Sequence, residues 1–133
     1  MQNLRSLRVV LAVTLAVNFS WGYMFCFTPS LVGRLYGLPL TDDMHLFLSL
    51  SRGACFFFLA ALSLLGLLRP RGFRVIALLL AVAYLFLFLV DVIMLAWGKM
   101  ELMKLLPEMA YFLLISAALV RFYPARIETL SKV

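Results

Sequence analysis

Four polar side chains interrupt the long apolar stretches of this 133-residue sequence: Asn18, Arg52, Asp91 and Glu108. One of them falls in each stretch, at a similar distance from the same end. A charge at the centre of a membrane-spanning helix costs roughly 2.5–3.5 kcal/mol on insertion scales, so charged residues in such helices face the interior of a bundle. We therefore expect these side chains to converge in one intramembrane polar cluster.

Two interpretations of this cluster stay open. In the structural interpretation, Arg52 and Asp91 form a salt bridge that makes insertion tolerable and fixes the register of their helices. Arginine suits this role because its planar guanidinium can grip a carboxylate with two hydrogen bonds. Glu108 then pairs with Lys104, which lies four residues earlier at a helix end.

In the functional interpretation, the same residues line a polar pocket that opens to the outer face. Arg52 would hold an anionic or carbonyl group, and Asp91 or Glu108 would accept a proton or a hydrogen bond. The pocket is completed by two tyrosines on the same helix faces and, at its mouth, by a histidine, a residue type whose charge changes near neutral pH. These are Tyr84, Tyr111 and His45.

Other familiar chemistries lack their residues. The sequence contains no H-E-x-x-H motif, no glycine-rich phosphate loop and no Ser/His/Asp set on matched elements. Its two cysteines, Cys26 and Cys55, have no C-x-x-C or metal-ligand spacing, and their predicted depths differ by ~15 Å, too far for a disulfide. We expect no metal and no cofactor. The formal charge of +6 follows the helix ends, so we expect no nucleic-acid partner.

The elements that position these residues are predicted to be membrane-spanning helices. Hydrophobic residues make up 65% of the chain and charged residues 14%, whereas soluble domains are near half apolar and a quarter charged. A bilayer requires about 20 apolar residues per span, and a backbone in hydrocarbon satisfies its hydrogen bonds as a helix. The sequence predicts an all-α bundle in a single transmembrane domain, residues 1–133, with helices at about 7–27, 44–68, 73–97 and 102–122.

The lysines and arginines predict the orientation of this bundle. Cytoplasmic ends of membrane proteins carry an excess of both residues. Eight of them fall at one end and three at the other: Arg5, Arg8, Arg69, Arg71, Arg74, Arg121, Arg126 and Lys132 against Arg34, Lys99 and Lys104. We expect both termini to be cytoplasmic and the loop over residues 28–43 to lie outside.

One segment carries a family resemblance. It has a proline after the first predicted helix, a short Gly-Leu-Pro element, and Arg-Gly-Ala within the second apolar stretch: Pro29, Gly37, Pro39, Arg52 and Gly53. The segment, mainly residues 28–68, resembles the DoxX-like group of small four-helix membrane proteins. The resemblance implies four helices, a buried arginine and a bacterial inner membrane. Some members of that group are accessory subunits of quinone-linked oxidoreductases.

The first functional hypothesis is an accessory or structural subunit of a membrane complex, with quinone-linked redox complexes as one candidate. Its partners would be other membrane subunits or a second copy of the chain. Small residues four apart let helices approach closely, and two such pairs could face a partner helix: Ser49 with Gly53, and Ala77 with Ala81.

The second hypothesis is a lipid-phase binding protein, or an isomerase- or cyclase-type enzyme, for a hydrophobic small molecule with a polar head. Arg52, Asp91 and Glu108 would act on that head. The stretch around Glu108 is similar to the Pro-x-Glu-Glu element of small membrane carotenoid cyclases, although only one glutamate of that pair is present. An oligomeric small transporter is the third hypothesis. The sequence contains no recognisable catalytic motif, and whether the protein is an enzyme stays open.

Overall fold

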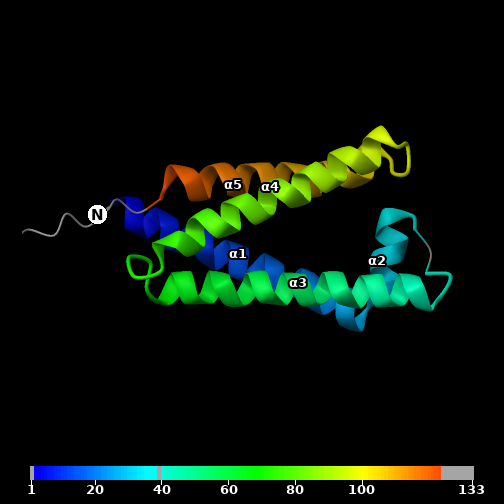
Figure 1. Ribbon diagram of the computed structural model, residues 1–133, viewed down its shortest axis with the longest axis horizontal. Coiled ribbons are helices and arrows are strands. Elements are labelled where there is room, and N and C mark those ends of the chain that lie inside the picture. The colour runs from blue at the N-terminus through cyan, green and yellow to red at the C-terminus, as the bar shows by residue number, and fades with distance from the viewer. Residues whose placement is uncertain (1, 39, 124–133) are drawn as a thin grey trace, which may run out of the picture.

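Within residues 2–38 and 40–123, which the computed structural model describes, the chain forms five α-helices (Figure 1). Their bounds are α1 Gln2–Phe27, α2 Pro29–Tyr36, α3 Asp43–Leu68, α4 Arg74–Ala96 and α5 Leu102–Arg121. All but α2 are long and apolar enough to cross a membrane. This confirms the prediction of an all-α chain with four such helices. Three residues named above lie outside the described residues: Pro39, Arg126 and Lys132.

The four long helices form two antiparallel pairs. α1 packs along α3 and α4 packs along α5, while smaller contacts join α3 to α4 and α1 to α5. The pairs lie close together at the end that holds the start of α1 and the α3–α4 turn (Figure 1). They diverge toward the end that holds α2 and the α4–α5 turn (Figure 1). The helices thus follow one another around a square, with α1 opposite α4 and α3 opposite α5.

A glycine brings α1 and α3 into close contact. A Cβ atom at Gly53 would clash with the Sγ atom of Cys26 and would lie 3.1 Å from the carbonyl oxygen of Gly22. Ser49, one turn before Gly53, donates a hydrogen bond of 2.9 Å to the carbonyl oxygen of Phe25. The small face formed by Ser49 and Gly53 therefore packs inside the chain, and the expectation that it faces a partner helix is wrong.

A short helix, α2, occupies part of the segment predicted as an outer loop. It begins at Pro29, because a proline in the first turn gives up only an N–H group that the helix leaves unpaired. It ends at Gly37, whose φ of 69° lies in the left-handed region that glycine enters without strain. The N–H of Leu38 then donates to the carbonyl oxygen of Gly33 at 2.8 Å and closes the helix end. The predicted loop is therefore wrong over residues 29–36.

Apolar side chains cover the outside of the bundle as well as its core. Phe58, Phe86 and Leu114 are 64%, 63% and 69% exposed. The second small pair, Ala77 and Ala81, is buried in the core and is not available to a partner helix. Proteins in water rarely expose large contiguous apolar surfaces, so this exterior suits an apolar solvent. The polar residues buried inside are Thr14, Asn18, Ser63, Asp91 and Glu108.

Candidate functional site

An ion pair crosses the interior of the bundle from α3 to α5. The Nη2 atom of Arg52 lies 2.6 Å from the Oε1 atom of Glu108. The side chain of Glu108 is 5% exposed and that of Arg52 is 34% exposed. Because α3 and α5 are opposite helices of the square, this bond passes through the space between the two helix pairs. It joins the pairs near the end at which they diverge.

The observed ionic partners differ from the predicted ones. The structural interpretation pairs Arg52 with Asp91 and Glu108 with Lys104, but Arg52 and Glu108 pair with each other. Lys104 instead lies 3.4 Å from Glu101 at the start of α5. Arg52, Asp91 and Glu108 lie at similar depths along their helices, so the direction of each side chain around its helix selects the partner of Arg52.

Tyr36, at the end of α2, is the third member of this group. Its hydroxyl donates a hydrogen bond to the Oε2 atom of Glu108. Burial raises the pKa of Tyr36 above its usual range, and the neighbouring Glu108 carboxylate raises that pKa further. The phenol therefore remains protonated and remains a donor. Sequence reasoning missed Tyr36 because it assigned residues 28–43 to a loop, although Pro29 and Gly37 are signals for the two ends of a short helix.

Aromatic rings enclose the guanidinium of Arg52. Its Cζ atom lies 5.1 Å from the ring centroid of Phe25 and 5.8 Å from that of Phe56, within the range of cation–π attraction. Trp21 extends this wall, with its ring 6.3 Å from Phe56 and 6.2 Å from Tyr36. The rings hold Arg52 in one direction, and its Nε atom is buried without a hydrogen-bond partner among the described residues.

Asp91 is the remaining acid of the site and is 2% exposed. Its Oδ2 atom is buried and has no hydrogen-bond partner within residues 2–38 and 40–123. The charges of Arg52 and Glu108 both act on it, so the site holds two carboxyl groups and one guanidinium. An unsatisfied buried polar atom costs about 1–3 kcal/mol. The Oδ2 atom of Asp91 and the Nε atom of Arg52 are thus an unused acceptor and an unused donor.

A second polar contact crosses the other diagonal of the bundle, from α1 to α4. The Nδ2 atom of Asn18 donates to the hydroxyl oxygen of Tyr84 at 2.6 Å, and both residues are fully buried. The ring of Tyr111 packs edge-on against that of Tyr84, with 5.8 Å between the centroids. No hydrogen bond in the described part of the chain joins these residues to Arg52. The hydrogen bonds of the predicted cluster thus fall into two groups, one on each diagonal, and a single cluster stays a prediction.

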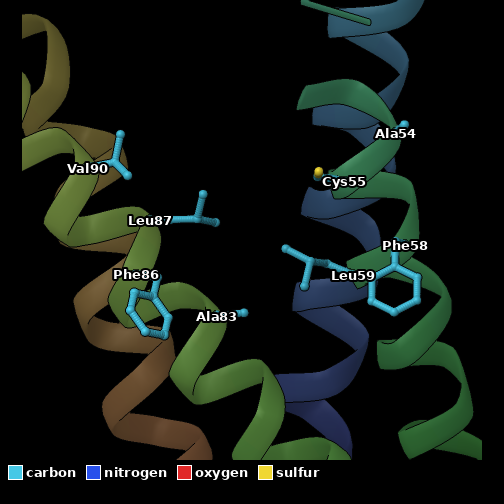
Figure 2. Close-up of a pocket in the computed structure, with 8 residues that line it drawn as sticks. All are labelled: Ala54, Cys55, Phe58, Leu59, Ala83, Phe86, Leu87 and Val90. Carbon is cyan, nitrogen blue, oxygen red and sulfur yellow. The ribbon is translucent and has the colours of Figure 1, made fainter. Parts of the chain in front are cut away.

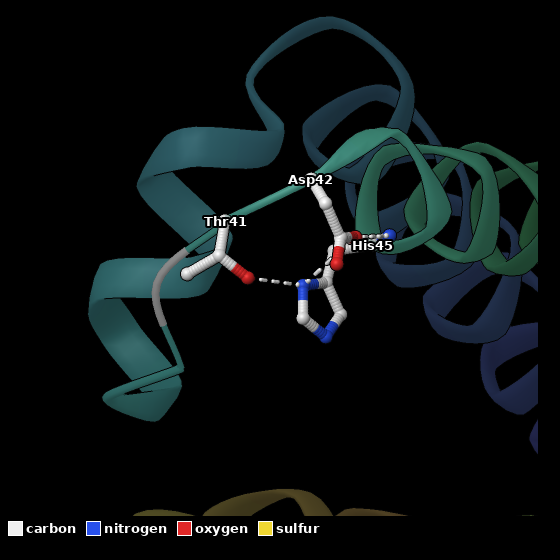
Figure 3. A network of polar contacts seen from close by, with 3 residues as sticks. All are labelled: Thr41, Asp42 and His45. Carbon is white, nitrogen blue, oxygen red and sulfur yellow. Dashed lines mark hydrogen bonds and ion pairs between the residues drawn. The ribbon is translucent and has the colours of Figure 1, made fainter.

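His45 belongs to neither group. Its Nδ1 atom lies 2.8 Å from the Oγ1 atom of Thr41 and 3.3 Å from the Oδ1 atom of Asp42 (Figure 3). The Asp42 side chain also accepts a hydrogen bond of 2.9 Å from the backbone N–H of His45 and caps the start of α3. These contacts stabilise the first turn of α3. A position for His45 at the mouth of a pocket stays a prediction.

An apolar groove of about 590 Å³ lies between α3 and α4. Its walls come from one helix of each pair, and Cys55 and Leu87 point into the space between them (Figure 2). Arg52 precedes Cys55 by three residues and Asp91 follows Leu87 by four, so each lies one turn from the groove on the same helix face. The groove therefore ends one helical turn from Arg52 and Asp91, which together with Glu108 and Tyr36 we call the Arg52 group. Its lining residues are Ala54, Cys55, Phe58, Leu59, Ala83, Phe86, Leu87 and Val90.

The residues of this site are suited to binding a ligand. No three His, Cys, Asp or Glu side chains of the described residues are grouped so that they could hold a metal ion. The Arg52 group instead presents one unused donor and one unused acceptor near an apolar groove, a combination that fits a molecule with a polar head and an apolar body. Comparisons with protein-family models, with curated proteins and with solved structures find no match for this chain.

Proposed function

We propose that the chain is a multi-pass protein of a bacterial inner membrane with both termini on the cytoplasmic side. Four helices of sufficient length and an apolar exterior support insertion. The arginines support the orientation, since cytoplasmic ends carry the excess of positive charge. The end at which α1 begins and α3 and α5 end holds Arg5, Arg8, Arg69, Arg71, Arg74 and Arg121, against Arg34, Lys99 and Lys104 at the other end.

Within this membrane, the protein binds a small hydrophobic molecule that carries one polar head. The observation that carries this proposal is the apolar groove between α3 and α4, whose lining residue Leu87 lies one helical turn before Asp91, a buried acid without a hydrogen-bond partner among the described residues. The apolar body of the ligand lies along the groove, and its head reaches the Arg52 group. A hydroxyl head, as in isoprenoid alcohols and sterol-like lipids, can accept a hydrogen bond from the Nε atom of Arg52 and donate one to the Oδ2 atom of Asp91. A carbonyl head, as in quinones, can only accept from Arg52.

The polar head has to supply most of the selectivity. Bilayer chains are as apolar as the groove, so the ligand body gains little by leaving the lipid. A hydrogen bond to a charged group is worth about 1.5–3 kcal/mol, and few polar partners exist elsewhere in hydrocarbon. Glu108 and the aromatic rings of Phe25 and Phe56 hold Arg52 in place before the ligand arrives, which lowers the entropic cost of binding.

The second candidate function, an accessory subunit, is favoured by the small residues of the same groove. Ala54, Cys55 and Ala83 would let a transmembrane helix of another protein approach closely. This role competes with the ligand for one surface. Catalysis by Asp91 and transport by an oligomer are predictions that no contact in the described residues favours over binding.

The test is mass spectrometry of the protein purified in a mild detergent, which identifies both bound lipids and bound proteins. The variant Ala83→Phe fills the groove. The matched control, Ala117→Phe, adds the same ring to an exposed alanine of α5 that does not line the groove. We expect one hydrophobic molecule to accompany the wild type and Ala117→Phe and to be lost from Ala83→Phe.

Each alternative result has a definite meaning. A stoichiometric protein that is lost only from Ala83→Phe would assign the groove to a partner helix and would support the accessory role. Wild-type protein that carries only the bulk lipids of its membrane, in the same proportions as the two variants, would contradict both functions of the groove.

A further inference from the structure

A basic cleft lies at the opposite end of the bundle from the Arg52 group. It has a volume of about 420 Å³, and four arginines line it together with Leu4 and Leu68. Arg5 and Arg8 are three residues apart and share one face of α1. Arg69 caps the end of α3 and Arg71 follows in the turn to α4. Two segments far apart in sequence thus bring four positive charges to one concave site.

No acidic side chain of residues 2–38 and 40–123 forms an ion pair with these arginines. The ion pairs in that part of the chain join His45 to Asp42, Arg52 to Glu108 and Lys104 to Glu101. The described acidic residues all lie toward the end that holds α2: Asp42, Asp43, Asp91, Glu101 and Glu108. An excess of arginine at one end of a membrane protein is ordinary. The placement of four arginines around one cleft is a separate feature, and it suits the binding of an anion.

We propose that this cleft binds the phosphate headgroup of an anionic phospholipid. Arginine forks match phosphate oxygens with paired hydrogen bonds, and basic pockets beside transmembrane helices bind such headgroups. Leu4 and Leu68 add apolar surface to the same cleft, which suits the glycerol and upper acyl chain of a lipid rather than a free phosphate ion. The inference rests on the proposed membrane insertion but not on the ligand of the α3–α4 groove.

The test places the full chain in nanodiscs of phosphatidylcholine, with or without a minor fraction of phosphatidylglycerol, and measures retained lipid by native mass spectrometry. Arg69→Gln/Arg71→Gln removes two charges from the cleft. Arg74→Gln/Arg121→Gln removes two charges from the same end outside its lining, where Arg74 stacks on Tyr123 at 5.8 Å. At about 1 kcal/mol for each arginine near the surface, the first variant should bind phosphatidylglycerol about 30-fold more weakly, and the second should stay close to wild type.

Several results would overturn the proposal. Equal weakening by the two double variants would mean that the general positive field of this end attracts lipid without a defined site. Equal retention of phosphatidylcholine and phosphatidylglycerol would remove the anionic selectivity. Displacement of the lipid by inorganic phosphate at the same concentration would show an ordinary anion site. Failure of the wild type to enter nanodiscs would contradict the membrane insertion itself, and the headgroup site with it, whereas entry without selectivity contradicts the headgroup site alone.

Discussion

We predict that the two members of the Arg52–Glu108 ion pair contribute unequally to the stability of the fold. Arg52→Met substitutes an unbranched apolar side chain for the arginine. It leaves two acids, Glu108 and Asp91, in one buried site without a cation. Glu108→Gln leaves Arg52 facing Asp91, so the charges balance and the amide can still accept a hydrogen bond from Arg52. We therefore expect Arg52→Met to destabilise the fold more than Glu108→Gln does.

The magnitudes follow from burial. Removal of one partner from a fully buried ion pair costs about 3–5 kcal/mol. Because the side chain of Arg52 is 34% exposed, solvent screens part of the loss, and we expect about 2–3 kcal/mol for Arg52→Met. Loss of a single charge-assisted hydrogen bond predicts about 1–2 kcal/mol for Glu108→Gln. The double variant should cost less than the sum of the single variants by at least about 1 kcal/mol.

The assay is a titration from mild detergent into sodium dodecyl sulfate, in which unfolding is followed by near-ultraviolet circular dichroism. Trp21 reports on the site because its ring lies 6.3 Å from that of Phe56 beside Arg52. Equal losses for the two single variants would refute the argument from charge balance. Strict additivity in the double variant would refute direct coupling between Arg52 and Glu108.

Further predictions concern helix packing, helix capping and pH. Gly53→Ala should lower the free energy of unfolding by about 1–3 kcal/mol through the clash with Cys26. Adding Cys26→Ala should restore part of the lost thermal stability, and no rescue would contradict the proposed contact. Gly37→Ala should cost about 1–2 kcal/mol in the same thermal assay because of its positive φ, and an unchanged melting temperature would argue against this end of α2. The pKa of Tyr36 is raised above 10.0 in the folded protein, so the phenol of the unfolded chain ionises first as pH rises. The wild type should therefore lose stability above about pH 10 more steeply than Tyr36→Phe. Parallel curves of stability against pH for the two proteins would contradict this.

The spans were predictable because their signal is local. Twenty or more apolar residues between charged or proline-bearing turns specify a helix in hydrocarbon whatever its neighbours are. The burial of Asn18, Asp91 and Glu108 was predictable for the same reason, since a polar side chain in an apolar helix is costly on the lipid-facing side. Four helices and a set of buried polar residues thus follow from the chain alone.

The pairing within the site did not follow, because it depends on directions around the helices. Asp91 and Glu108 lie at similar depths, and depth does not tell which of them faces Arg52. Tyr36 joined the site only because residues 29–36 form a helix. The α3–α4 groove arises from divergence of the two helix pairs, and the basic cleft arises from the fold of the α3–α4 turn toward α1. Both are tertiary features without a local pattern in the sequence.

The most direct test of the binding function is Asp91→Leu, with bound ligand and unfolding stability measured on the same preparation. Leucine removes a buried acceptor that lacks a partner among the described residues, so the ligand-free protein should keep its stability or gain about 1 kcal/mol. Its bound hydrophobic ligand should fall at least about tenfold, the equivalent of one hydrogen bond to a charged group. Unchanged ligand content, or unfolding of the variant in the absence of ligand, would instead make Asp91 a structural residue and would contradict the proposed site.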